Sequence, residues 1–169
     1  HIESVQEFGK PVVVALNRFA TDTAEEIAIV RTRCEELGAA FSQSDHHAQG
    51  GKGAIDLAKA VISKFGGEEV PKTAGLRPLY ELGEPVVDKI KKVARAMYGA
   101  RDVVFTKAAE KDLGKIDALG FSNLPICIAK APSSLSDDPS LRGRPRDFDV
   151  GVSNIVINSG AGFLVVLTG

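Results

Sequence analysis

The chain has 169 residues, the length of one domain or of one domain with a small appendage. Hydrophobic residues make up 44%, and 21 Lys and Arg against 22 Asp and Glu leave a formal net charge of −1. This composition is typical of a globular protein and lacks the basic excess of proteins that bind nucleic acid or anionic lipid. Trp is absent and glycine accounts for 17 residues, so we expect an aliphatic core and glycine-rich loops.

The cysteines and the apolar runs point to a reducing compartment and away from membranes. Cys34 and Cys127 lie far apart, without a C-x-x-C or His-rich tract beside either, so each is predicted to be a small buried side chain. No apolar run approaches the ~18 residues that cross a bilayer. The chain starts at His1 without a signal-peptide profile. We expect a cytoplasmic protein with no nucleic-acid or membrane partner, and the missing initiator Met indicates a fragment.

The first strand and helix are predicted from a continuous β-branched run followed by a capping pattern. The run at 11–16 begins with a proline, and its composition predicts a central strand covered on both faces. Asp22 is expected to cap the next helix, with Glu25 reaching back to it three residues later. Apolar side chains then recur at helical spacing until Gly38, whose left-handed conformation would end the helix.

A second strand and helix follow. A short strand is predicted at 39–42, and a polar, glycine-rich loop at 44–53. The helix after it is expected to turn Ile55, Val61 and Ile62, together with Ala58 and Phe65, toward the core.

The best internal boundary is the stretch 66–78, which has no periodicity and reads as a connector. It divides the chain into an α/β part at 1–70 and a second α/β part at 71–169. The second part is predicted to contain a long helix with a kink or restart at Pro85, then further strands and helices. These are a helix at 79–99, a strand at 102–106, a helix at 107–119, a strand at 125–129, a loop at 132–147, and strands at 149–158 and 163–168.

The alternation of strands and helices predicts the fold class. It is an α/β fold with a layered, mostly parallel sheet, flanking helices and a C-terminal antiparallel strand pair.

The loop 17–22 is the first candidate site, because ligands of open α/β sheets lie beyond the carboxyl ends of the strands. Asn17-Arg18 resembles the start of a guanine-binding Asn-Lys-x-Asp element, but Ala20 stands where Asp is needed. Two interpretations remain for the loop. Phe19 either forms a flat platform for a ligand or packs against the protein.

The loop 44–53 is the second candidate. Its glycines would let backbone amides approach a phosphate or a flat ring, but aligning Gly51-Lys52 on a P-loop places His46 at the first glycine and Gly53 at the Ser/Thr. A metal is disfavoured, since adjacent histidines rarely aim at one point and no second ligand cluster accompanies them. A histidine ring that faces a ligand and a solvated loop both remain open.

Two further segments are weaker candidates. The run Ser136-Asp137-Asp138-Pro139 would hold Mg²⁺ or cap a turn, and the arginines of 142–146 would bind phosphate or carboxylate groups unless the whole loop is solvated. The glycines of 158–163 precede a strand, so they are interpreted as a tight turn and not as a dinucleotide fingerprint. The sequence shows no nucleophile with its base and no catalytic motif.

Several stretches in the same order resemble the formate–tetrahydrofolate ligase family. They are PVVVALNRFATDT at 11–23, AQGGKG at 48–53, LPICIAK at 124–130, SLSDDP through GRP within 134–145, and SGAGF through LTG within 159–169. The resemblance runs over essentially the whole chain. It implies roughly the last third of the family sequence, without the large P-loop nucleotide domain and stopping short of the usual C-terminus.

The resemblance implies an activity for the complete protein. Members join formate to tetrahydrofolate with ATP and Mg²⁺, by way of formyl phosphate, to give 10-formyltetrahydrofolate, ADP and phosphate. In this reading the chain alone is inactive, the missing N-terminal P-loop domain is its partner, and a homo-oligomer is expected. The alternative is a free-standing α/β module that binds a small ligand or a partner without catalysis.

The resemblance also implies site residues. An aromatic side chain from each of two loops encloses the pterin ring of the folate, and these positions are Phe19 and His47, where many members have Trp in place of His47. Arg144 and Pro145 are expected near the nucleotide base. No catalytic residue and no metal ligand are assigned to this chain.

Overall fold

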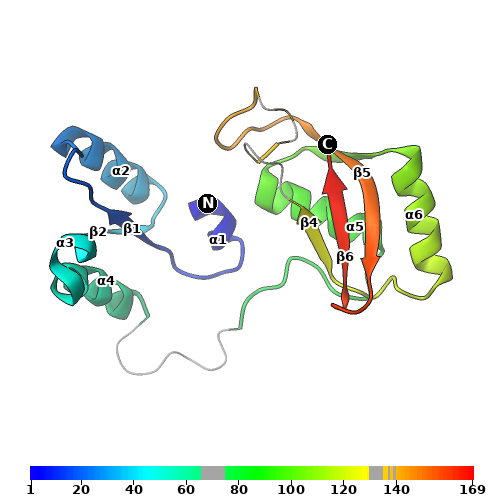
Figure 1. Cartoon of the computed structure of the whole chain (residues 1–169), viewed down its shortest axis with the longest axis horizontal. Helices are drawn as coiled ribbons and strands as arrows, with labels where there is room; N and C mark the ends of the chain where they lie inside the picture. The colour runs from blue at the N-terminus through cyan, green and yellow to red at the C-terminus, as the bar shows by residue number, and fades with distance from the viewer. Residues whose placement is uncertain (66–74, 130–134, 137, 139) are drawn as a thin grey trace. The chain divides into compact units, whose positions relative to one another are not determined.

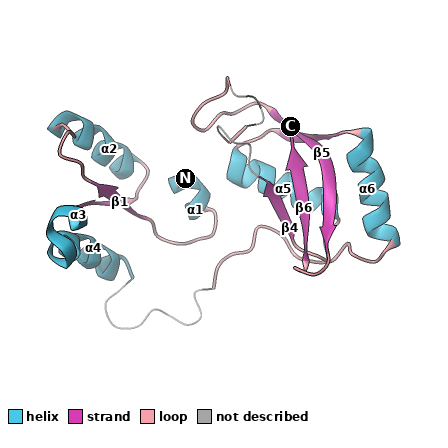
Figure 2. Ribbon diagram, viewed as in Figure 1, coloured by secondary structure: helices cyan, strands magenta, loops and turns pink. Residues whose placement is uncertain are grey.

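The computed structural model describes residues 1–65, 75–129, 135–136, 138 and 140–169 (Figure 1). The chain divides into two compact units, His1–Arg77 and Pro78–Gly169. Each unit has its own sheet and its own helices (Figure 2). Within the described ranges, no helix combines the length and the apolarity needed to span a bilayer.

The first unit contains a parallel two-stranded sheet. Strands β1 and β2 pair in a register that runs from Val13 opposite Ala40 to Asn17 opposite Ser44. The elements are α1 (Ile2–Gln6), β1 (Val13–Asn17), α2 (Ala24–Glu36), β2 (Ala40–Ser44), α3 (His46–Gln49), the 3-10 turn η1 (Gly50–Ala54) and α4 (Ile55–Phe65). Both strands therefore end at the same edge of the sheet, where their following loops meet.

Strand β1 differs from the prediction of a central strand covered on both faces. Within the described residues it pairs only with β2, and its side chains are half-buried or exposed. A β-branched run predicts a strand that other elements can cover on both faces. Which strands pair with it and which helices cover it depends on other segments, and the local sequence does not specify them.

Helix α4 also differs, because three of its apolar side chains expected in the core are exposed. Ile55, Val61 and Ile62 have 48%, 38% and 57% of their surface accessible, and Ala58 is exposed as well. The side chain of Phe65 lies outside the described residues. The half-buried positions are Leu57 and Ala60 instead. The predicted helix is therefore confirmed, but the face predicted to point toward the core is wrong.

The capping pattern of α2 lies one residue later than predicted. Thr23, not Asp22, is the N-cap, and its hydroxyl accepts a hydrogen bond from the amide of Glu26. The Glu26 carboxylate in turn accepts from the Thr23 amide at 2.9 Å, which completes a capping box. Asp22 is engaged elsewhere, in the loop before the helix. The predicted stop at Gly38 is confirmed by its φ of 69°.

The second unit is a four-stranded sheet with the strand order β3-β5-β6-β4. Strand β5 is parallel to β3 and antiparallel to β6, and β6 is parallel to β4. The elements are α5 (Val86–Val93), the π-helical turn η2 (Ala94–Tyr98), β3 (Asp102–Phe105), α6 (Lys107–Ala118), β4 (Ile126–Ala129), β5 (Asp149–Asn158) and β6 (Phe163–Thr168). The predicted fold class, with its C-terminal antiparallel pair, is confirmed. The strands are divided between two separate sheets, one in each unit.

The helix predicted at 79–99 begins only at Val86, because Pro85 occupies its N-cap. The same residue fixes where the helix starts, as a proline with no amide hydrogen is tolerated there. Leu82, which precedes the observed helix, is 52% exposed. Cys34 is buried as predicted, whereas Cys127 is exposed. Strand β4 lies at the edge of the sheet, so one of its faces is only partly covered.

A single hydrophobic core holds the second unit together. Helix α6 packs against β5 and helix α5 against β4. Ile90, Ala94, Ala109, Val152, Leu164 and Val166 are fully inaccessible members of this core. Lys89 is also completely buried, and its ammonium donates to the carbonyl oxygens of Ser122 at 2.7 Å and Leu124 at 3.2 Å. Burial lowers the pKa of Lys89.

Strand β5 carries an irregularity that α6 stabilises. The register with β6 shifts between Val152 and Asn154. Asp112 on α6 accepts the amide of Ile155 at 3.2 Å, and the Thr106 hydroxyl donates to the carbonyl oxygen of Ser153 at 2.7 Å. Two side chains of the helix thus bind backbone groups of the irregular segment.

Candidate functional site

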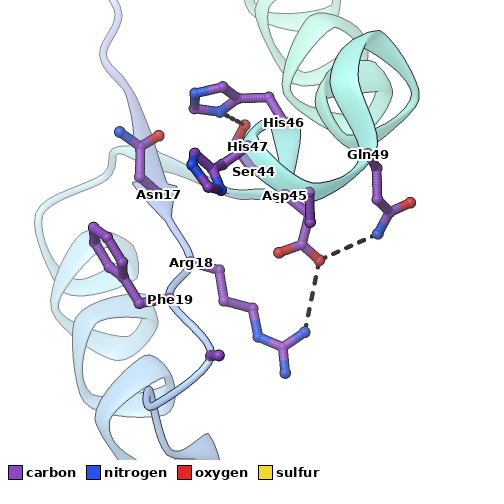
Figure 3. Close-up of a pocket in the computed structure, with 10 residues that line it drawn as sticks. Asn17, Arg18, Phe19, Ser44, Asp45, His46, His47 and Gln49 are labelled. Carbon is purple, nitrogen blue, oxygen red and sulfur yellow. Dashed lines mark hydrogen bonds and ion pairs between the residues drawn. The ribbon is translucent and has the colours of Figure 1, made fainter.

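A cavity of the first unit opens at the carboxyl ends of β1 and β2. Its volume is about 750 Å³, which falls within the range of small-molecule sites. We call it the ring pocket. It is lined by Asn17, Arg18, Phe19, Ala20, Ser44, Asp45, His46, His47, Ala48 and Gln49 (Figure 3). The structure therefore brings the two predicted loops together, and Phe19 and His47 line one cavity.

The loop after β1 presents Phe19 to solvent. Its side chain is 68% exposed, although exposure of a phenyl ring to water is unfavourable. The backbone is fixed by Asp22, whose carboxylate accepts the Phe19 amide at 2.8 Å and whose own amide donates to the Phe19 carbonyl oxygen at 3.1 Å. The Arg18 amide also donates to the Ser44 carbonyl oxygen at 3.1 Å, which ties the two strand ends together. The ring is held in place by its backbone and not by packing.

The segment after β2, predicted as a polar, glycine-rich loop at 44–53, folds into short helical turns. Asp45 begins it, and the Asp45 amide donates to the carbonyl oxygen of Gly53 at 3.0 Å. Gly50 has φ 57° and ψ −141°, a conformation that favours glycine. The glycines thus serve to fold the turn, in addition to any approach that they allow a ligand.

The two histidines have different surroundings. Nδ1 of His46 lies 2.9 Å from the hydroxyl oxygen of Ser44, a residue only 3% exposed. His47 makes no such bond within the described residues. In Figure 3 the imidazole rings of His46 and His47 lie near each other at the strand ends, across the β1 ribbon from the side chains of Asn17 and Phe19. A flat ligand between Phe19 and His47 would therefore meet the polar groups of Asn17 and His46 at its edge.

A charged group occupies the other side of the ring pocket. Arg18 Nη1 lies 3.6 Å from Asp45 Oδ2, and Gln49 Nε2 donates to the same oxygen at 3.5 Å (Figure 3). Sequence reasoning did not single out Ser44 or Asp45. Their place in the pocket follows from the parallel register of β1 and β2, which places Ser44 opposite Asn17 so that both strands end at the same level.

The histidines and carboxylates that the structure describes do not form a metal-binding group. Across the described ranges, no three His, Cys, Asp or Glu side chains converge as they would around an ion. Asp137 and Pro139 of the run considered for Mg²⁺ lie outside the described residues. Asp138 accepts hydrogen bonds from the amide and the hydroxyl of Ser140, at 2.8 Å and 2.6 Å, which lower the pKa of its carboxyl. The Asp138 carboxylate is therefore already bound by donors of the protein.

Arg144 and Pro145 belong to the second unit. Arg144 Nη2 donates to the Ala96 carbonyl oxygen at 3.0 Å, and Pro145 is buried. A Cβ on Gly99 would lie 2.9 Å from the Pro145 carbonyl oxygen, so the loop packs closely on the end of η2. The guanidinium of Arg144 thus already binds backbone at the end of a helix.

The sequence matches one family model over its whole length. The description of that model is formate–tetrahydrofolate ligase, and it covers residues 1–169. A protein of Parabacteroides distasonis named formate–tetrahydrofolate ligase is 44% identical over 169 residues, which is 100% of this chain. The chain spans 30% of the length of that relative.

Proposed function

Because the chain belongs to the formate–tetrahydrofolate ligase family, we propose that its ring pocket binds the pterin ring of tetrahydrofolate between Phe19 and His47. The observation that carries the proposal is the exposed phenyl ring of Phe19, at 68% accessibility, on a backbone fixed by Asp22. A flat heterocycle would cover this ring and remove its apolar surface from water. His47 on the second loop supplies the opposite face.

The pocket also supports the polar part of this ligand. A pterin carries hydrogen-bond donors and acceptors along one edge. Asn17 offers an amide that both donates and accepts, and His46 keeps one ring nitrogen beyond the nitrogen that contacts Ser44. An aromatic sandwich with polar groups at its rim is the usual form of a site for a flat polar ligand.

For the complete protein we propose the activity of the family. Formate attacks the terminal phosphate of ATP, which gives formyl phosphate and ADP. N10 of tetrahydrofolate then attacks the formyl carbon, phosphate leaves, and 10-formyltetrahydrofolate forms after loss of the N10 proton. This chain contributes one wall of the folate site and no catalytic residue. Mg²⁺ is expected with ATP, but no ligand for it is assigned to this chain.

The expectation that Arg144 and Pro145 lie near the nucleotide base stays a prediction. So does the expectation of a homo-oligomer.

The test is a calorimetric titration of this chain with tetrahydrofolate. Phe19→Ala and His47→Ala are each expected to weaken binding about fivefold, since one stacked ring contributes roughly 1 kcal/mol. Ile29→Ala is the matched control, because Ile29 is 70% exposed on α2 and lines no part of the ring pocket. Tetrahydrofolate affinity should be unchanged in that variant.

Two results would contradict the proposal. One is equal affinity in wild type, Phe19→Ala and His47→Ala. The other is formate-dependent ATP hydrolysis by this chain alone, which would place the chemistry here and not in the remainder of the protein. Binding of tetrahydrofolate without turnover is the expected result.

A further inference from the structure

A second cavity adjoins the ring pocket at Arg18, which lines both. Its volume is about 360 Å³, and it lies between the first turns of α2 and the end of β2. We call it the arginine cavity. Its polar wall consists of Arg18, Arg31, Asp22 and Gln43, and its small apolar side chains include Ala24 and Ala28. Two guanidinium groups thus face one cavity that contains a single carboxylate.

The guanidinium of Arg31 is held by an aromatic ring and not by an anion. Its central carbon lies 4.6 Å from the centre of the Phe41 ring, an arrangement that stabilises the cation from one face. Within the described residues Arg31 forms no ion pair. Its N–H groups at the edge therefore remain able to bind a carboxylate with two parallel hydrogen bonds.

Arg18 is only loosely engaged. Its contact with Asp45 is 3.6 Å long, and its side chain is 47% exposed. Such exposed pairs contribute little, with a typical range of about 0–1 kcal/mol. An incoming carboxylate would therefore compete easily for this guanidinium.

Asp22 does not neutralise the two arginines. One of its oxygens accepts the Phe19 amide at 2.8 Å, which commits that oxygen to the loop. Among the residues that line this cavity, two positive groups face one carboxylate, and Asp45, which contacts Arg18 at 3.6 Å, lines the ring pocket instead. The lining of the arginine cavity therefore carries a net positive charge that favours an anionic ligand.

We propose that the arginine cavity binds the glutamate carboxylates of the tetrahydrofolate tail while the pterin occupies the ring pocket. This inference rests on the proposed function, because it concerns the same ligand. Tetrahydrofolate joins an aromatic ring system to a tail that ends in carboxylates, and the two cavities join an aromatic pocket to a cationic one. Arg18, next to Phe19 in the sequence, stands at the junction.

The test compares tetrahydrofolate with tetrahydropteroate, which lacks the glutamate and its two carboxylates and ends in the benzoate carboxylate instead. Calorimetric affinities are measured for wild type, Arg31→Ala and Arg33→Ala. Arg33 is the matched control because it lies on the same helix, carries the same charge, pairs with Glu36 and lines neither cavity. Wild type is expected to bind tetrahydrofolate about fivefold tighter than tetrahydropteroate. Arg31→Ala should abolish that preference, and Arg33→Ala should retain it.

The outcomes separate the two proposals. Equal affinity of wild type for both ligands, or an unchanged preference in Arg31→Ala, overturns the assignment of the tail to the arginine cavity and leaves the ring pocket in place. No binding of either ligand to wild type overturns both. Unchanged tetrahydropteroate binding in Arg31→Ala shows that the variant is folded. The preference should also shrink at high salt, because the interaction is electrostatic.

Discussion

A Cβ on Gly53 would lie 2.5 Å from both the carbonyl carbon and the carbonyl oxygen of Asp45. No side chain fits at that distance, so the backbone of the turn that carries His46 and His47 would have to move. We expect Gly53→Ala to weaken tetrahydrofolate binding more than tenfold, because one wall of the ring pocket would be displaced. Calorimetry on the variant measures this loss.

Gly51→Ala is the control for this substitution. A Cβ at Gly51 meets nothing within 4 Å, and Gly51 lies in the same short turn, so affinity should be retained. Equal losses in both variants would mean that the turn tolerates no substitution at all and that the close approach to Asp45 is not the cause.

His47→Trp is expected to strengthen binding. An indole offers more stacking area than an imidazole, and a gain of about fivefold follows from roughly 1 kcal/mol of added stacking. The chain contains no other Trp, so the fluorescence of this indole reports directly on the ring pocket. Titration with tetrahydrofolate should change its emission. An indole that does not respond to the ligand would place His47 outside the contact.

Thr23→Ala should destabilise α2. Removal of the cap exposes the amide of Glu26, and such losses cost about 1 kcal/mol. Both tyrosines, Tyr80 and Tyr98, lie in the second unit, so tyrosine fluorescence does not report on this helix. Hydrogen exchange of peptides from 24–36 is the appropriate measurement.

Thr32→Ala provides the comparison for the capping prediction. Thr32 is exposed within the same helix, where Ala has the higher helix propensity. Exchange in this variant should be unchanged or slower. Faster exchange in Thr32→Ala than in Thr23→Ala would contradict the assigned cap.

Asp112→Ala should lower the free energy of unfolding of the second unit by about 1–3 kcal/mol, because the amide of Ile155 loses its partner. The hydrogen bond from Ile155, followed by the one from Lys115, lowers the pKa of Asp112. A carboxyl whose pKa is lower in the folded state stabilises the fold above its unfolded pKa of ~3.9. That stability is lost as the pH falls through the lower, folded value.

Urea unfolding at pH 7 and at successively lower pH measures this dependence through tyrosine fluorescence. The difference between wild type and Asp112→Ala should narrow below about pH 4. Glu110→Ala, an exposed carboxylate on the same helix, should unfold like wild type across the range. A difference for Asp112→Ala that does not change with pH would mean that the ionised carboxylate is not the stabilising group.

Local patterns were sufficient to predict most helices and strands of the chain. Gly38 ends α2 as expected, and Gly120 follows α6 directly after the predicted helix at 107–119. Their φ values of 69° and 74° are left-handed, a conformation that glycine adopts readily. The order of elements and the antiparallel pair of β5 and β6 also follow from short-range signals.

The failures have two causes, a competing hydrogen bond nearby in the sequence and the position of distant segments. Asp22 and Thr23 are both good caps, and Asp22 is removed from the choice by the Phe19 amide. Cys127 lies in an apolar run but on an edge strand, and sequence alone does not tell which strand lies at an edge.

For the candidate site, the residues could be predicted but their arrangement around one cavity could not. Phe19 and His47 were predicted from family resemblance, and their common cavity follows from the parallel register of β1 and β2, which sequence periodicity does not supply. The arginine cavity combines residues of a loop, a helix and a strand, so no contiguous motif marks it.

Buried apolar side chains are divided unequally between the two units. Among the described residues, those of the first unit are Ile27, Cys34 and Ala39, whereas the second unit has a continuous core of twelve. The first unit, which carries the ring pocket, is therefore expected to have a low free energy of unfolding. A ligand that binds only the folded form raises the free energy of unfolding in proportion to the logarithm of its concentration. Bound tetrahydrofolate would then stabilise the first unit as additional buried apolar side chains would. The resistance of residues 1–65 to proteolysis would increase with the fraction of ring pockets that hold tetrahydrofolate.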